Sequence, residues 1–330
     1  MDLSHVLLYA IVPIVVVMLA GYLSGKKGVF DGNDAKKFNK VVLDYALPAA
    51  LFVSIAQSSR SELGADMKLS IISLVVLMAC FMLVYFVFRY GFKKNTQADA
   101  AVAALISGSP TIGFLGFAVL EPIFEVAPFG ASQGAVALVV AIVGIVVNAV
   151  GIPVGLALLN AGNAKASGKK ESPWKPVINA LKQPVAWAPI LAVVWVLVGI
   201  PFPKWLAPSF DLIKGANASM AVFSAGITLS AIAIKINLQA IIGSVLKLII
   251  MPAAVLIVGI LFKMDYVNLQ MLVAAAALPP AFSGIIIADE YDTYVATGTT
   301  SLTLSVILYI GFCPLWIWIT EVAAHAAGIC

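Results

Sequence analysis

The feature that most constrains this chain is a series of apolar segments, most of them about as long as a bilayer is thick. A helix of about 20 apolar residues crosses the hydrocarbon core of a membrane. Alternating strands of the kind that build a membrane barrel are absent, so helices are favoured. The sequence predicts an all-α integral membrane protein of about ten transmembrane helices. The expected spans are Leu3–Leu23, Phe38–Gln57, Leu69–Phe88, Ala98–Leu120, Ser132–Leu159, Val185–Ile200, Leu212–Ile234, Ala240–Phe262, Asn268–Glu290 and Tyr294–Thr320.

Composition supports the same class. The chain is 62% hydrophobic and only 11% charged, whereas soluble domains have about 45–50% apolar and about 25% charged residues. Such a chain exposes more apolar surface than one soluble core can bury, so the bilayer is its expected solvent. The first apolar run follows Asp2 instead of a basic segment, and no cleavage site follows it. We therefore interpret it as a helix and not as a signal peptide.

The distribution of basic residues predicts the topology. Most of the 20 Lys and Arg residues lie in connections that follow the odd-numbered spans, as in the clusters at Lys26–Lys40, Arg89–Lys94 and Lys165–Lys182. By the positive-inside rule these connections are cytoplasmic, and both termini are periplasmic or extracellular. Topology explains the basic clusters more simply than nucleic-acid binding does, so no nucleic-acid partner is expected.

Weak internal similarity indicates two repeats. The segments Ala10–Ile14 and Ala186–Ile190 resemble each other, as do Ala100–Pro110 and Val273–Pro280. The sequence thus predicts a five-helix repeat at 1–160, a cytoplasmic linker at 161–183 and a second five-helix repeat at 184–330. Because five is odd, the second repeat enters the membrane from the opposite side, which gives an inverted pair.

The fourth and ninth spans are interrupted near their centres by Pro110 and by Pro279–Pro280. Proline removes a backbone donor and disrupts the preceding helical turn. The freed backbone groups must be buried in protein or line a polar cavity. The half-helices that follow begin inside the membrane with free N–H groups and a positive dipole end, a combination that holds anions. A simple kink is the alternative, but two interruptions at matched positions favour a site for a small anion.

We expect the residues around the two interruptions to bind the substrate. Hydroxyl groups can donate to a carboxylate, and glycine allows close backbone approach. The alternative for each Ser or Thr is a hydrogen bond to its own helix. The candidates are Ser107, Ser109, Pro110, Thr111, Gly113, Phe114, Pro279, Pro280, Ala281, Ser283 and Gly284.

Two charged residues and two amides fall within the expected spans. Lys247 and Asp44 are candidates for charge compensation or ion coupling, since charge inside a membrane is costly. Snorkelling or an ion pair is the alternative for both. Asn148 and Asn217 are possible polar contacts, although helix–helix hydrogen bonding explains them as well. Few acidic residues lie at depth, so a Na⁺ site formed by carboxylates is not expected, while Na⁺ held by backbone carbonyls remains an alternative. We expect H⁺ in preference to Na⁺ as the coupling ion.

Enzymatic chemistry is not indicated. The segment Gly130–Gly134 matches G-x-S-x-G, but it opens an expected membrane helix and lacks the strand–turn–helix setting. The two histidines, His5 and His325, lie near the ends of the chain. Cys80, Cys313 and Cys330 have neither metal-ligand nor disulfide spacing. We expect no enzyme activity, no metal and no cofactor.

The chain resembles the auxin efflux carrier family, and within it the bacterial malonate carriers. The resemblance rests on Tyr45–Ala49, Ala221–Gly226, Lys247 with Pro252, and the run from Pro279 through Ala288–Tyr291 to Pro314–Trp316. It covers nearly the whole chain. Plant members often carry Asn before the first interruption, where this chain has Ser109. This departure disfavours auxin-like substrates and leaves a small anion.

The resemblance implies a fold and a mechanism. Helices 4 and 9 would cross at their interruptions, helices 1, 2, 6 and 7 would form a dimeric scaffold, and helices 3–5 and 8–10 would carry substrate past it by an elevator mechanism. The expected function is secondary active transport of a small dicarboxylate, most plausibly malonate, across a bacterial inner membrane. A carrier of malate or another organic anion, or a membrane receptor with a vestigial site, remains an alternative.

Overall fold

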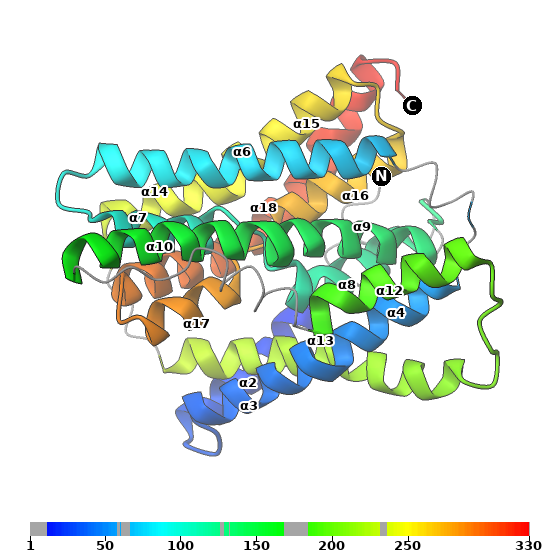
Figure 1. The fold of residues 1–330 in the computed structure, drawn as a ribbon, viewed down its shortest axis with the longest axis horizontal. Coiled ribbons are helices and arrows are strands. Elements are labelled where there is room, and N and C mark those ends of the chain that lie inside the picture. The colour runs from blue at the N-terminus through cyan, green and yellow to red at the C-terminus, as the bar shows by residue number, and fades with distance from the viewer. Residues whose placement is uncertain are drawn as a thin grey trace. The chain divides into compact units, whose positions relative to one another are not determined.

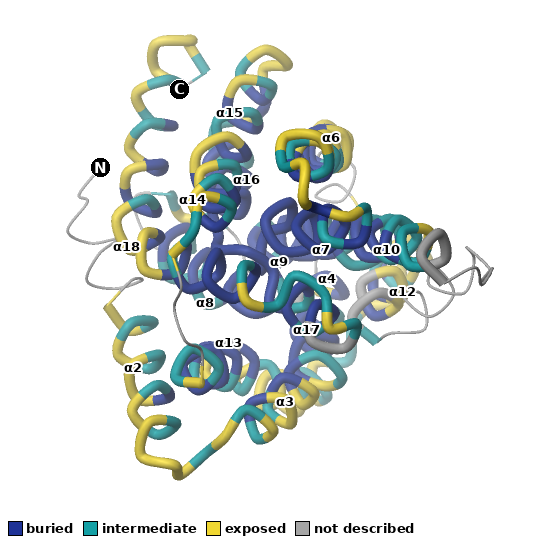
Figure 2. The backbone as a smooth tube through the Cα atoms, turned by 90° about the vertical axis from the view of Figure 1, so that its left-hand side faces the viewer, coloured by how far each residue is buried: buried dark blue, intermediate teal, exposed yellow. Residues whose placement is uncertain are grey.

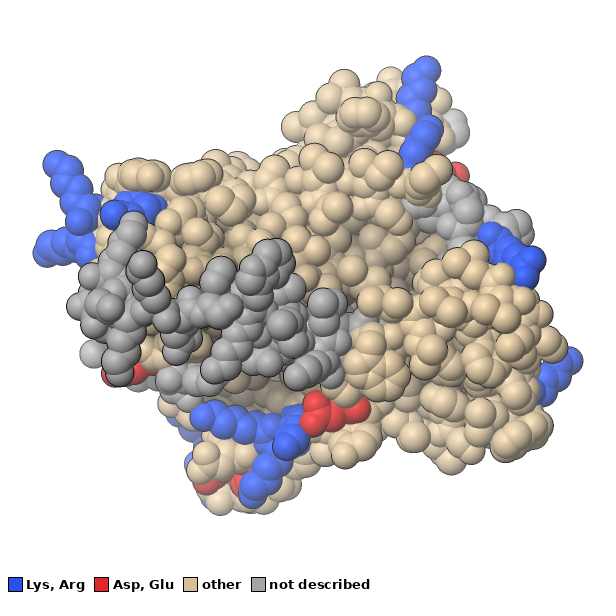
Figure 3. Space-filling view, in the orientation of Figure 1, with Lys and Arg blue, Asp and Glu red and all other residues tan. Residues whose placement is uncertain are grey.

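The computed structural model describes residues 12–57, 60, 67–125, 129–131, 133–167, 184–231 and 236–329. Their regular structure is helical (Figure 1), which confirms the predicted all-α class. Within these residues, five helices are long and apolar enough to cross a membrane: Met67–Gly91, Gly134–Asn163, Ala207–Ser230, Leu238–Leu261 and Val295–Ala326. The face shown in Figure 3 is largely uncharged among its described residues, as lipid contact requires.

The helices follow the expected apolar runs closely, and the first run is described from Val12 onward. In chain order they are α2 (Val12–Lys26), α3 (Gly32–Val41), α4 (Leu47–Ala56), α6 (Met67–Gly91), α7 (Gln97–Ser107), α8 (Ile112–Phe124), α9 (Gln133–Ile145), α10 (Ile152–Ser167), α12 (Pro184–Val198), α13 (Ala207–Ser230), α14 (Leu238–Val245), α15 (Met251–Leu261), α16 (Tyr266–Ala277), α17 (Phe282–Glu290) and α18 (Val295–Ala326). The helix α10 extends into the stretch predicted as a linker, and residues 168–183 lie outside the described part.

Three π-helical segments join pairs of α-helices, and the sequence did not predict them. They are Val42–Ala46, Val146–Gly151 and Leu246–Ile250. A proline follows shortly after each segment, at Pro48, Pro153 and Pro252. Proline cannot donate the usual helical hydrogen bond, so the preceding turn is free to widen. Each segment also contains one of the polar residues singled out above, namely Asp44, Asn148 or Lys247.

The chain divides into two compact units, which are described separately. The first contains the described residues within Met1–Ser70, Ile112–Gly144 and Gln183–Ile232. It therefore includes α8 and most of α9. The family resemblance instead implies that these two helices belong with the transport helices. In this unit α13 packs against α2, α3, α4 and α8, and α12 packs against α4.

Glycines set the distance between α2 and α13. A Cβ atom at Gly21 would lie 2.1 Å from the carbonyl oxygen of Phe223, and one at Gly226 would lie 2.0 Å from that of Met18. Both contacts would be severe clashes, so the two backbones approach closely only because these side chains are absent. Small residues permit the same close packing of helices in membranes generally. Figure 2 shows the buried side of α2 facing α13 and its exposed side facing away.

The second unit contains the described residues within Ile71–Thr111, Ile145–Lys182 and Ala233–Cys330. Here α7 packs along α10, a contact that can be followed in Figures 1 and 2, and α17 packs against α7. The long helix α18 packs against α14, α16 and α17. Most residues of α7 and of α16 are buried. These two helices therefore form the centre of the unit, and a proline follows the end of each within three residues.

Candidate functional site

The first interruption separates α7, which ends at Ser107, from α8, which begins at Ile112. Gly108 closes α7 by donating its amide to the carbonyl of Ala104 at 2.8 Å. A Cβ atom at Gly108 would lie 2.9 Å from Cα of Phe81, so only glycine fits this approach to α6. Pro110 follows two residues later and cannot continue the helix. Local sequence thus explains why the helix stops here.

The second interruption separates α16, which ends at Ala277, from α17, which begins at Phe282. Leu278 adopts an extended conformation, with φ −51° and ψ 149°. This conformation is expected because the residue before a proline is sterically excluded from the helical region. Two successive prolines, Pro279 and Pro280, then keep the chain out of the helix until Phe282.

The two interruptions contact each other within the second unit through backbone hydrogen bonds. The Thr111 amide donates to the Pro279 carbonyl at 2.9 Å, and Pro110 and Pro280 pair as an isolated antiparallel bridge. The Ala281 amide donates to the carbonyls of Ser109 and Ile106, at 3.0 and 3.2 Å. These bonds satisfy backbone groups that the broken helices would otherwise leave free. The amides of Thr111 and Ala281 are therefore not available to a ligand in this arrangement.

The hydroxyl groups at the interruptions have different environments. Ser107 Oγ lies 3.2 Å from Ser301 Oγ, and both side chains are buried. Thr111 Oγ1 is buried and has no hydrogen-bond partner. Ser109 is also buried, and Ser283 is half-buried. A buried hydroxyl without a partner costs free energy, so Thr111 is the strongest candidate among them for contact with a polar ligand.

Space beside the first interruption is small. A void of about 10 Å³ lies between Phe81, Ser109, Gly151 and their neighbours. A void of that size holds about one water molecule. Gly284, from the second interruption, packs tightly, since a Cβ atom there would lie 2.6 Å from the Leu105 carbonyl oxygen. In this arrangement the void beside the first interruption is too small for an organic ligand.

Lys247 lies close to the second interruption and is fully buried, with 0% exposure. Its ammonium group donates to the Ala276 carbonyl oxygen and lies 3.4 Å from Met251 Sδ. Ala276 is in the last turn of α16, where carbonyl groups lack helical partners and the dipole is negative. Among the described residues that are buried, Lys247 is the one with a formal charge. Its ammonium group therefore offsets the negative end of the α16 dipole.

The other sequence candidates are divided between the two units, with Asn148 in the second and the remaining four in the first. Gly113 and Phe114 begin α8 in the first unit, where a Cβ atom at Gly113 would lie 2.9 Å from Leu47 Cδ2. Asp44 is half-buried. Asn217 is 1% exposed, and its amide nitrogen and oxygen have no partner. Asn148 belongs to the second unit and lies in the π-helical segment after α9.

Sequence reasoning missed two polar features of the second unit. Ser305 donates to Ser244 at 2.9 Å, and Ser244 donates to the Ser301 carbonyl at 3.3 Å, which extends the contact of Ser107 into α14 and α18. Trp316 Nε1 donates to the Leu248 carbonyl at 2.7 Å. Leu248 lies four residues before Pro252, so its carbonyl cannot receive the usual helical bond. A proline in the sequence indicates which carbonyl loses its helical partner. It does not indicate which side chain donates to that carbonyl instead.

A charged cluster lies at the end of α8 in the first unit. Lys214 Nζ lies 2.8 Å from Glu121 Oε1 and 5.4 Å from the centre of the Phe117 ring. Glu125 follows the last residue of α8 and has a buried oxygen without a partner. Burial, with the charge of Glu121 adding to it and that of Lys214 opposing it, raises the pKa of Glu125 to about 7. Across the described ranges, no three His, Cys, Asp or Glu side chains gather as a metal site.

Apolar helices of membrane length define an integral membrane protein. Residues 6–317 match the family described as "Membrane transport protein", and the chain belongs to that family. This confirms the resemblance to auxin efflux carriers, which are relatives within the same group.

Individual relatives support the assignment. The chain is 49% identical over 314 residues to the "Uncharacterized transporter YfdV" of Escherichia coli K12, covering 95% of this chain and 98% of that protein. It is 23% identical over 307 residues to the "Putative malonate transporter" of Rhizobium meliloti, covering 90% and 91% of the two chains. A rice protein named "Probable auxin efflux carrier component 9" is 26% identical over 153 residues, covering 44% and 36%.

Proposed function

We propose that this protein is a secondary active transporter of a small dicarboxylate anion, with malonate as the first candidate. The observation that carries the proposal is the position of Lys247 at the negative end of α16, beside the meeting point of the two interruptions. An ammonium group there offsets the carbonyl dipoles, so the remaining field of the positive helix end and the lysine favours an anion.

The proposed binding site lies in the second unit. The carboxylates would meet the first turn of α17, with Thr111 Oγ1 and Ser283 as hydroxyl donors. Thr111 supports this role because its buried hydroxyl has no protein partner. Ser107, Ser109, Pro110, Pro279, Pro280, Ala281 and Gly284 would shape the site. Gly113, Phe114, Asp44, Asn148 and Asn217 remain predictions from the sequence.

We also propose that the protein has ten transmembrane helices in two inverted repeats. Helices 4 and 9 would be broken and would cross at their interruptions. The helix ends at Ser107 and Ala277, each followed by proline, support it. Movement of helices 3–5 and 8–10 past a dimeric scaffold, in elevator fashion, is part of the same proposal. The proposal also includes an inner-membrane location and periplasmic termini, which are predictions from the sequence.

Proton coupling is proposed in preference to sodium coupling. A sodium ion bound in a membrane protein is commonly held by backbone carbonyls at broken helices. At the end of α16 such a position is taken by the ammonium group of Lys247. A second cation there would be repelled at short range.

Uptake of radiolabelled malonate into proteoliposomes tests the proposal, with pH and Na⁺ gradients imposed in separate experiments. We expect uptake that a pH gradient drives and that unlabelled malate inhibits in part. Acetate, which has one carboxylate, should inhibit weakly. Protein-free liposomes give the background.

The possible outcomes separate the candidates. Malonate uptake driven by a Na⁺ gradient alone would overturn the proposal of proton coupling, but it would still support malonate as the substrate. Thermal stabilisation by malonate without uptake under any gradient would favour a receptor. Neither uptake nor stabilisation by any dicarboxylate in the panel would overturn the substrate class.

A further inference from the structure

A second cavity lies in the first unit. Its volume is about 620 Å³, within the range of ligand sites. It lies where α4 and α12 end and α13 begins, and its lining among the described residues includes the polar side chains of Gln57, Arg60 and Lys204. The two segments that flank Arg60, 58–59 and 61–66, lie outside the described residues.

Arg60 is fixed at one side of this cavity. Its Nε and Nη2 atoms donate to the carbonyls of Val196 and Leu197, at 3.2 and 2.9 Å, in the last turn of α12. Gly199, with φ +82°, leaves the room that the guanidinium occupies, since a Cβ atom would lie 2.3 Å from Nη2. An arginine side chain has five N–H donors, so donors remain after these two bonds.

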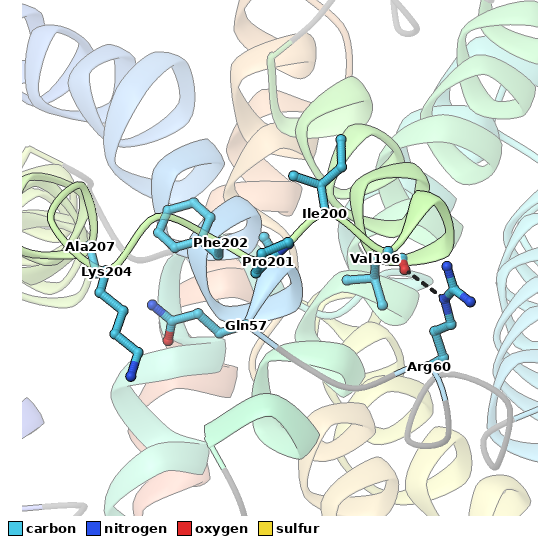
Figure 4. Close-up of a pocket in the computed structure, with 10 residues that line it drawn as sticks. Gln57, Arg60, Val196, Ile200, Pro201, Phe202, Lys204 and Ala207 are labelled. Atoms are coloured by element: carbon cyan, nitrogen blue, oxygen red, sulfur yellow. Dashed lines mark hydrogen bonds between the residues drawn. The ribbon is translucent and has the colours of Figure 1, made fainter.

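The described lining residues of the cavity carry positive charge and no negative charge. Lys204 and Arg60 line it, and no Asp or Glu does so among the described residues. Figure 4 shows Arg60 turned toward Val196, while Lys204 and Gln57 extend on the other side of Pro201. Arg60 has a structural role as a helix cap, but that role accounts for neither Lys204 nor Gln57.

The remaining wall is apolar and adjoins exposed apolar side chains. Ile200, Pro201 and Phe202 form part of the lining. Just outside the polar part, Leu197 and Val198 are 59% and 61% exposed, and Trp205 is 79% exposed. Exposed Trp beside apolar residues at the end of a membrane helix is typical of the headgroup region of a bilayer. A cavity in which Lys204 and Gln57 adjoin an apolar wall suits an amphipathic anion better than a freely hydrated one.

We propose that this cavity binds the phosphate group of an anionic phospholipid, with Lys204 and Gln57 donating to the phosphate and Ile200–Phe202 contacting the glycerol and first methylenes. Basic pockets at membrane helix ends recognise lipid headgroups by the same chemistry. The bound lipid would brace the ends of α4 and α12 against the start of α13. The site is independent of the proposed dicarboxylate site.

The test uses the full chain, purified and delipidated in detergent. Phosphatidylglycerol or phosphatidylcholine is titrated while thermal unfolding is followed, and native mass spectrometry counts bound lipid. We expect saturable stabilisation by phosphatidylglycerol. Lys204→Gln should raise its midpoint concentration about tenfold, as expected for loss of one charged hydrogen bond. Lys204→Arg, which keeps the charge, should retain the effect.

Lys40→Gln is the matched control, because Lys40 is an exposed lysine of the same unit outside the cavity. It should leave the midpoint unchanged. Equal midpoints for wild type and Lys204→Gln would overturn the proposal. Equal stabilisation by phosphatidylcholine would overturn recognition of charge. Stabilisation by millimolar inorganic phosphate or malonate that depends on Lys204, without any by lipid, would reassign the cavity to a soluble anion.

Discussion

The ammonium group of Lys247 donates a hydrogen bond to the carbonyl oxygen of Ala276, one residue before the end of α16. The two residues come from different helices of the second unit, and the bond links the π-helical segment after α14 to the second interruption. A buried charge is tolerated only with such compensation. The helix dipole supplies it here, because the last carbonyls of a helix carry partial negative charge.

Replacing Lys247 with Met separates a functional role from a structural one. Met preserves much of the side-chain volume and removes both the charge and the donor to the Ala276 carbonyl. The gain from not burying an ammonium group therefore opposes a loss of about 1–3 kcal/mol for the unpaired carbonyl. We expect a folded protein whose unfolding free energy changes by no more than about 3 kcal/mol, with malonate uptake reduced at least about tenfold because the counter-charge is lost. Lys93→Met, at an exposed site of the same unit, is the control. Normal uptake by Lys247→Met would remove this residue from the mechanism.

The sequence indicated where the helices stop but not how the freed groups are used. Pro110 and Pro280 place both interruptions because proline cannot continue a helix. Which carbonyl accepts from Thr111 or Ala281 depends on contacts between segments far apart in the chain, and no local pattern encodes it. The sequence suggested open helix N-termini, whereas two of those amides bind carbonyls of the opposite interruption.

Thr111→Val tests the unpartnered hydroxyl. Valine has nearly the same shape, so the change removes the hydroxyl alone. A buried polar group without a partner costs about 1–3 kcal/mol, and we expect the variant to be at least as stable as wild type. Binding of malonate, measured by the thermal shift at increasing concentration, should weaken about tenfold if Oγ1 contacts substrate.

Thr300→Val is the control for Thr111. The Thr300 hydroxyl is also buried, but it donates to the Ala296 carbonyl of its own helix at 2.9 Å. Its loss should leave malonate binding unchanged. Equal malonate affinity in wild type and Thr111→Val would exclude Thr111 as a ligand.

Trp316→Phe removes the donor that satisfies the Leu248 carbonyl. That carbonyl is buried and has lost its helical partner to Pro252, so we expect a loss of about 1–3 kcal/mol. In a Pro252→Ala background, residue 252 again has an N–H group that can donate to the Leu248 carbonyl. Trp316→Phe should then reduce the free energy of unfolding by less. A double-mutant cycle of unfolding free energies measures the difference. Additive effects would show that the indole bond does not compensate for the proline.

Gly226→Ala tests the close contact of α2 and α13. The new Cβ atom would meet backbone atoms, including the Met18 carbonyl oxygen at 2.0 Å, and backbone cannot move as a side chain can. We expect destabilisation of about 1–3 kcal/mol or more. Gly215→Ala lies on the same helix with nothing within 4 Å of the added atom, and it should be neutral or slightly stabilising. Similar unfolding temperatures for the two variants would contradict the packing argument.

The raised pKa of Glu125 predicts a pH dependence of stability. Its ordinary value is 4.5, and burial raises it to about 7 in the folded protein. Between these values the folded state keeps a proton that the unfolded state has released, so stability should fall as pH rises from about 4.5 to about 7. Thermal unfolding measured across this range should show the decrease in wild type. Glu125→Gln, which stays neutral, should flatten it.

Glu121 provides the second part of that experiment. Its negative charge helps to raise the pKa of Glu125, while Lys214 opposes the shift. Glu121→Gln removes the repulsion and frees Lys214 from its ion pair, so the folded pKa of Glu125 should decrease toward its ordinary value. The pH range over which stability falls should then narrow from its upper end. An unchanged slope in both variants would assign the pH dependence to other groups.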